Sequence, residues 1–110
     1  MDGTIVITIH SPAGMSREDF LAKMQSEVFP EVHKGPTRVG QIESWTLLEA
    51  AETAEGHAES DKYTWVINWN GLSNTAVLAN GAIEKLRSLG AKVHSTNHKI
   101  ADEFSREAVP

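Results

Sequence analysis

Three side chains in this sequence are the candidates for moving a proton or stabilising an oxyanion: His10, His94 and Asn68. Imidazole is the natural general acid and base near neutral pH. A side-chain amide can donate a hydrogen bond to an enolate oxygen. These residue types predict that His10 or His94 transfers a proton at a carbon next to a carbonyl, with Asn68 at the enolate oxygen. The structural alternative is that both imidazoles are hydrogen-bonded groups of the interior or of an interface.

Five further residues are expected to line a substrate site. They are Thr8, Val66, His98, Trp45 and Tyr63. Tryptophan suits stacking against a flat ligand, and its indole N–H needs a partner. The other two tryptophans, Trp65 and Trp69, are expected in the core under the helices.

A metal site is not expected. His94 and His98 are four residues apart, a spacing that on a strand separates them by roughly 13 Å, too far for one ion. His57 lies in an acidic stretch and is expected to be solvated. A cofactor is not expected either, although a single histidine could ligate haem.

Four strands and two helices must hold these side chains. The strands are predicted from β-branched and aromatic residues and from alternation. They cover residues 4–10, 39–48, 63–70 and 92–98.

The first helix is predicted to begin at Ser16 as N-cap, with a buried stripe formed by Phe20, Leu21, Met24 and Val28. Pro30 and then Gly35-Pro36 are expected to end it.

The second helix is expected to begin at Ser73 or Asn74 and to end at Gly90. Its predicted apolar face comprises Ala79, Ala82, Ile83 and Leu86.

The resulting order, β-α-β-β-α-β, is the split βαβ arrangement of an α+β, ferredoxin-like domain. It predicts a four-stranded antiparallel sheet of order 4-1-3-2 with both helices on one face. Residues 1–110 form one domain. Residues 49–61 are an acidic loop or short helix, and residues 99–110 are a tail.

The face of the sheet away from the helices is expected to meet something other than bulk water. In this topology His10 and His94 lie at one end of the sheet, near Tyr63 and Thr64, and Asn68 and His98 fall towards the other. One chain cannot cover that face itself, which predicts a homodimer. The residues assigned to the face are Val6, Thr8, His10, Val66, Asn68, His94, Thr96 and His98, none of them Lys, Asp or Glu.

Residues 12–20 (PAGMSREDF), followed by Pro30, are similar to the start of the first helix in EthD-like proteins. The element order and size resemble the dimeric α/β-barrel superfamily. That resemblance implies two ferredoxin-like protomers whose opposed sheets enclose a cavity. The EthD-like pattern has an aromatic residue and a histidine where this sequence has Met24 and Val28, so that histidine is not carried over.

Members of the superfamily include cofactor-free monooxygenases, muconolactone-type isomerases, polyketide cyclases and haem-degrading enzymes. The resemblance therefore implies a cavity that binds a small hydrophobic or aromatic molecule, in a cofactor-free enzyme acting on an enolisable substrate. The alternatives are a non-catalytic binding or stress-responsive dimer of the same fold, and haem binding.

Composition excludes several other classes. The 110 residues include no cysteine and carry a formal charge of −5 at pH 7. The absence of cysteine excludes disulfides, thiolate catalysis and cysteine-type zinc sites. The acidic surface disfavours nucleic-acid binding. The chain shows neither a signal peptide nor a membrane-spanning apolar stretch, so a cytoplasmic location is expected.

Overall fold

A computed structural model describes residues 3–33, 42–50, 61–70 and 75–102, with the backbone alone for residues 75–79. Its elements, in chain order, are β1 (Gly3–His10), α1 (Arg17–Lys23), the π-helical segment η1 (Met24–Val28), α2 (Phe29–Val32), β2 (Ile42–Glu49), β3 (Lys62–Trp69), α3 (Thr75–Ser88) and β4 (Lys92–Lys99).

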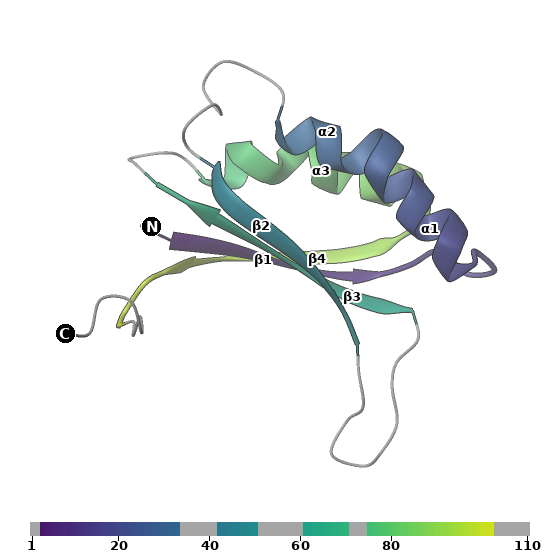
Figure 1. The fold of residues 1–110 in the computed structure, drawn as a ribbon, viewed down its shortest axis with the longest axis horizontal. Coiled ribbons are helices and arrows are strands. Elements are labelled where there is room, and N and C mark those ends of the chain that lie inside the picture. Colours follow the sequence, from purple (N-terminus) through teal and green to yellow (C-terminus); the bar gives the residue numbers. More distant parts are fainter. Residues whose placement is uncertain (1–2, 34–41, 51–60, 71–74, 103–110) are drawn as a thin grey trace, which may run out of the picture.

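The four strands form one antiparallel sheet of order β2-β3-β1-β4. Figure 1 shows that α1, α2 and α3 all lie on the same side of this sheet. The arrangement is of the α+β class and consistent with a ferredoxin-like fold. The predicted strand order and the central position of the first strand are confirmed.

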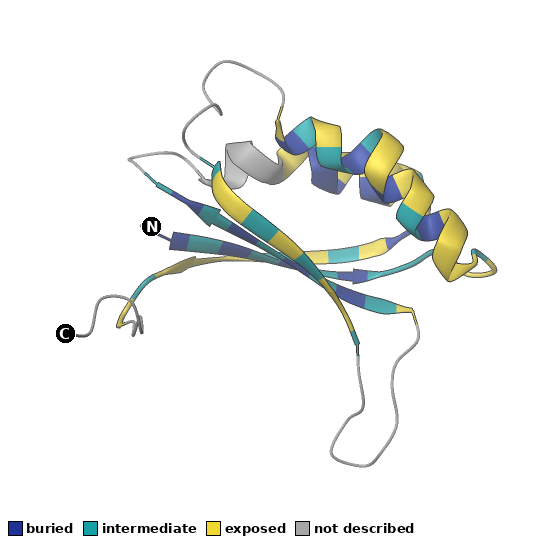
Figure 2. Ribbon diagram, in the orientation of Figure 1, coloured by how far each residue is buried: buried dark blue, intermediate teal, exposed yellow. Residues whose placement is uncertain are grey.

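Alternation along the two central strands separates the two faces of the sheet. Each second residue of β1 and β3 is buried against the helices, and each residue between them is half-buried (Figure 2). Trp65 and Trp69 are on the buried side, as predicted. The core comprises Ile5, Ile7, Ile9, Phe20, Met24, Val28, Val32, Tyr63, Trp65, Ile67, Trp69, Ala82, Ile83, Leu86 and Ala91.

Helix α1 begins as its sequence predicts. The Ser16 hydroxyl accepts a hydrogen bond from the backbone N–H of Asp19 at 3.1 Å, which caps one of the free amides of the first turn. Arg17 then ties the helix to the edge strand β2. Its Nε and Nη2 donate to the two carboxylate oxygens of Glu49 at 2.8 and 3.0 Å.

The first helical segment extends beyond Pro30 and ends at Val32. The N–H of Phe29 donates to the carbonyl of Met24, five residues back, which is the π-helical pattern. Pro30 thereby falls in the first turn of α2, directly after this wider turn, a position that tolerates proline. The predicted stop signal Gly35-Pro36 lies outside the described residues.

Helix α3 ends at Ser88, and Gly90 provides the glycine just beyond its last turn that the sequence predicts. Gly90 adopts a left-handed φ of 95°, and its N–H donates to the carbonyl of Arg87. The next N–H, of Ala91, donates to the carbonyl of Leu86, which completes a Schellman motif. The chain then turns directly into β4. The predicted caps Ser73 and Asn74 lie outside the described residues.

Where the chain is described, the predicted strand boundaries agree with the observed ones to within one residue, and the predicted start of the second strand, residue 39, lies outside the described residues. Residues 51–60, most of the predicted acidic segment, lie outside the described part, as do residues 103–110 of the tail. Among the described helices, none is long and apolar enough to span a membrane.

Candidate functional site

The helix-free side of the sheet, called the open face below, carries most of the predicted site residues. Strand pairing arranges its side chains in rows that run across the strands in the order β2, β3, β1, β4. None of the side chains in these rows is a carboxylate. The rows are Ser44, Asn68, Thr4 and His98; then Thr46, Val66, Val6 and Thr96; then Leu48, Thr64, Thr8 and His94; and, on three strands, Lys62, His10 and Lys92.

The centre of the open face is half-buried and its outer strands are exposed. Val6, Thr8, Thr64 and Val66 are shielded by their neighbours in the sheet, whereas 49% of Leu48 is exposed. The aliphatic and hydroxyl side chains in the middle therefore form a shallow apolar floor between two polar ends.

Two of the three predicted catalytic residues lie close together. His94 stands directly opposite Thr8, and His10 is two residues further along β1, on the same face. Asn68 is two strands and four residues away from His94, roughly 16 Å by the spacings of a sheet. The structure thus brings His10, His94 and Thr8 together and places Asn68 at the opposite end.

Hydrogen bonds occupy that opposite end. Asn68 accepts from the Thr4 hydroxyl and donates from Nδ2 to the Ser44 hydroxyl, both at 3.0 Å. His98 Nε2 lies 2.8 Å from the Thr96 hydroxyl. An amide nitrogen carries two hydrogens, so Asn68 keeps one donor for a further acceptor. The two hydrogen bonds that Asn68 makes nevertheless link β3 to its neighbours β1 and β2.

The two aromatic residues predicted to bind substrate lie on the other side of the sheet. Trp45 pairs with Ile67, stacks on Phe29 with ring centroids 4.4 Å apart, and donates from Nε1 to His33 Nε2 at 3.2 Å. A bulge between Ile42 and Ser44 shifts the alternation of β2, and Trp45 faces the helices. Trp45 therefore packs with the helices and contributes nothing to the open face.

Tyr63 also faces the helices. It pairs with Ile9, is only 2% exposed, and lies 4.8 Å from Phe20 between ring centroids. Burial raises the pKa of the Tyr63 hydroxyl, and the negative charge of Glu49 adds to that effect. The sequence predicts Tyr63 near His10 and His94. In the structure the sheet separates them, because the phenol faces the helices and both imidazoles stand on the open face.

A hollow at the His10 end contains groups that the sequence analysis missed. Asp61 Oδ2 lies 3.6 Å from His10 Nδ1, with the two side chains 59% and 40% exposed. A carboxylate beside Nδ1 favours the tautomer protonated there, which leaves Nε2 as the basic nitrogen. The hollow has a volume of about 350 Å³ and is lined by His10, Ser11, Ala13, Asp61, Gly90 and Lys92.

The sequence did contain a signal for this cluster. Asp61 and Lys62 immediately precede and begin β3, and Lys92 begins β4. In the predicted antiparallel order, both strand starts lie beside the end of β1, where His10 stands. Asp61 is the last residue of the predicted acidic segment, and the topology places it and both lysines at one corner.

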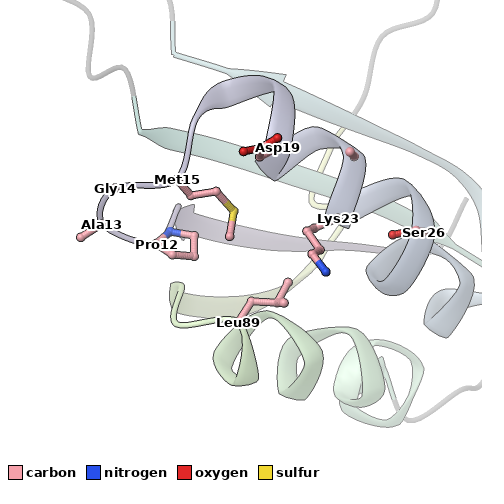
Figure 3. Close-up of a pocket in the computed structure, with 9 residues that line it drawn as sticks. Pro12, Ala13, Gly14, Met15, Asp19, Lys23, Ser26 and Leu89 are labelled. Atoms are coloured by element: carbon pink, nitrogen blue, oxygen red, sulfur yellow. The ribbon is translucent and has the colours of Figure 1, made fainter.

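A second hollow, of about 620 Å³, lies on the helical side of the molecule (Figure 3). The loop before α1, the side of α1 and Leu89 after α3 form its walls, and Met15 points into it. Lys23 also lines this hollow, and its ammonium group lies 3.1 Å from the Glu27 carboxylate. None of the predicted site residues lines this hollow, so the open face remains the candidate site.

Neither a search for metal ligands nor comparison with known proteins adds a functional assignment. In the described ranges, no three histidine, aspartate or glutamate side chains gather as metal ligands would. Comparison with protein-family models, curated proteins and solved structures finds no match for the chain.

Proposed function

We propose that two copies of this chain pair through their open faces and enclose a cavity for a small hydrophobic or aromatic molecule, on which the dimer acts as a cofactor-free acid–base enzyme. One observation carries the proposal. The rows of the open face hold imidazole, hydroxyl and aliphatic side chains together with the Asn68 amide and two lysines, with no carboxylate among them, and no described helix covers this face.

The size of the open face suits a second copy as its cover. Each of the four strands has eight residues. With about 3.3 Å per residue and 4.8 Å between strands, the face measures roughly 500 Å². Two such faces bury at most about 1,000 Å², the least expected of a biological interface. The half-buried Val6 and Val66 supply an apolar centre, and the exposed Leu48 adds an apolar side chain on the edge strand β2.

His10 has the best position for a catalytic base. With Asp61 beside Nδ1, Nε2 removes a proton from the carbon next to a substrate carbonyl. The electron pair of the C–H bond forms a C=C bond, and the π pair of the carbonyl moves to its oxygen. The hydroxyl of Thr8 and the imidazole of His94 supply donors for the enolate oxygen. The enolate then takes a proton at another carbon, closes a ring, or reacts with dioxygen.

The dimer is tested by native mass spectrometry and light scattering of the protein purified without added ligand. We expect a dimer, with extra mass where a ligand is retained. Val66→Lys places a charge at the centre of the open face and should give a monomer. Gln25→Lys places the same charge on an exposed helical position and should leave the dimer intact. A wild-type monomer at micromolar concentration contradicts the proposal.

Proton transfer is tested separately from any complete reaction. Aromatic ketones are incubated with the dimer in heavy water, and exchange at the carbon next to the carbonyl is followed by NMR. His10→Gln should abolish the catalysed exchange, and Asp61→Asn should reduce it. A dimer that binds these ketones without catalysing exchange identifies the alternative function, a non-catalytic binding protein.

A further inference from the structure

The polar side chains in two rows of the open face differ in their hydrogen bonding. In one row, the Asn68 amide bonds to the hydroxyls of Thr4 and Ser44, so these groups satisfy one another. Two rows away, Thr8 and Thr64 stand directly opposite each other on β1 and β3. Neither hydroxyl has a hydrogen-bond partner in the part of the chain that the structure describes. This second row therefore has donors left for a ligand.

The Thr8–Thr64 pair has a geometry that suits two acceptors of one molecule. Both residues lie on the central strands of the sheet and are half-buried. Directly opposed residues of an antiparallel pair have Cβ atoms about 4.5–5.5 Å apart. A hydroxyl donates one hydrogen and rotates it to suit the acceptor. The pair thus presents two donors side by side, one from each strand.

The residues around the pair favour an uncharged ligand with an apolar body. The rest of the row is Leu48 and His94, so the row contains no lysine or arginine to pair with an anion. The next row carries Val66 and Val6 on the same two central strands. Burying an ionised group without a partner costs far more than burying a carbonyl that accepts a hydrogen bond. A neutral molecule with two carbonyl oxygens at the hydroxyls and apolar atoms over the valines fits this part of the face.

We propose that Thr8 and Thr64 recognise the two oxygens of a 1,3-dicarbonyl compound whose apolar body lies over Val6 and Val66. This inference rests on the proposed function, because it names the substrate class of that same site. The three-carbon unit of such a compound holds its two oxygens a short distance apart, so that one hydroxyl donates to each. A compound with a single carbonyl uses only one of the two donors.

The chemistry of a 1,3-dicarbonyl compound also matches the proposed base. The carbon between two carbonyl groups loses its proton more readily than a carbon beside one, because the enolate shares its charge over both oxygens. Thr8 and Thr64 then donate to the two atoms on which that charge develops. His10 lies one row away on the same face, and an imidazole is a weak base that suits a carbon acid of this kind.

The test uses two ketones with the same carbon skeleton, 1-phenylbutane-1,3-dione and 1-phenylbutan-1-one, titrated calorimetrically into wild-type protein near neutral pH. The dione should bind about tenfold more tightly, as for one additional hydrogen bond. Thr64→Val removes one hydroxyl and keeps the shape of the side chain, so it should abolish this preference. The affinity for the monoketone should not change, because Thr8 remains as its donor.

The matched control is Thr46→Val, the same change on the open face of the edge strand β2, one row away. Thr46 lies outside the Thr8–Thr64 pair, so this variant should keep the full preference for the dione. Light scattering of the same samples records whether each protein is a dimer.

Each outcome bears on one of the two proposals. Equal affinity for both ketones, a preference that Thr64→Val leaves unchanged, or one that Thr46→Val also abolishes overturns recognition by the Thr8–Thr64 pair and leaves the dimeric cavity standing. Binding of neither ketone overturns that recognition as well. A preference that depends on Thr64 in a protein that remains monomeric supports the recognition and overturns the dimeric cavity.

Discussion

The two faces of the sheet share the same strands and follow different physical rules. The covered face is built from large apolar side chains such as Ile5, Ile7 and Trp65, all fully buried. The Nε1 atoms of Trp65 and Trp69 are buried on this face and have no hydrogen-bond partner among the described residues. The open face has smaller and more polar side chains. The first face stabilises the chain, which leaves the second free to carry chemistry.

The difference between the two faces is tested most directly by truncating neighbouring side chains of β1, one on each face. Ile7→Ala on the covered face should lower the free energy of unfolding by about 2–5 kcal/mol, since the cavity cannot be filled. Val6→Ala on the open face should lower it by less than about 1.5 kcal/mol. Urea unfolding at several protein concentrations separates these losses from any change in dimerisation. Equal losses would contradict the difference between the faces.

A smaller loss is expected at Gly3, where the covered face leaves no room. A Cβ atom there would overlap the Trp69 ring and lie 2.6 Å from the His98 carbonyl oxygen. Gly3→Ala should therefore cost about 1–3 kcal/mol. Gly14 is the control, because its φ of 80° matters but no atom lies within 4 Å of an added Cβ. Gly14→Asn should cost little, since asparagine tolerates this conformation. The same denaturation experiment ranks the two variants.

Tyr63 reports the covered face spectroscopically, because it is the only tyrosine in the chain. Burial raises its pKa, so the phenolate absorbance of the native protein should titrate above the unfolded value of about 10. The stability that this shift represents is present below pH 10 and is lost as pH rises through the folded pKa.

The control for this titration moves the phenol to the other face. In the double variant Tyr63→Phe with Thr64→Tyr, the tyrosine stands on the open face and should titrate nearer the ordinary value. Coincident titrations of the wild type before and after denaturation would show that Tyr63 is not desolvated.

The smallest effect is expected from Arg17 and Glu49, the exposed ion pair at the rim of the covered face. The hydrogen bonds from Arg17 lower the pKa of Glu49. The pair therefore stabilises the fold above the unfolded pKa of Glu49, and that contribution is lost as pH falls through the lowered value. Arg17→Gln should lower the melting temperature slightly at pH 7 and not at all once Glu49 is protonated. A pH-independent difference would assign the effect to packing.

Much of the fold could be predicted because its signals are local. Alternation in β1 and β3, the Ser16 cap and the left-handed Gly90 each depend on a few neighbouring residues. The order of the strands followed from chain order and the known preference for this topology. The placement of His10 and His94 at one end followed from antiparallel pairing alone.

The features that could not be predicted depend on contacts between residues far apart in the sequence. The bulge at Ile42 and Ser44 is a property of β2 and β3 together, and it is associated with the covered position of Trp45. The approach of Asp61 to His10 requires the register of β1 and β3 to be known. The bond between Trp45 and His33 joins an edge strand to the end of α2. Each involves residues distant in the sequence.

The π-helical segment before Pro30 has a consequence for the phase of the helix. Phe20, Met24, Val28 and Val32 are all fully buried and stand four residues apart. In a regular α-helix each four-residue step overshoots a full turn by about 40°, so three steps would rotate Val32 about 120° away from Phe20. The wider turn of η1 takes up this drift and keeps the stripe straight along the sheet. The four-residue spacing of these buried side chains in the sequence is thus the pattern expected of a helix that is locally under-wound.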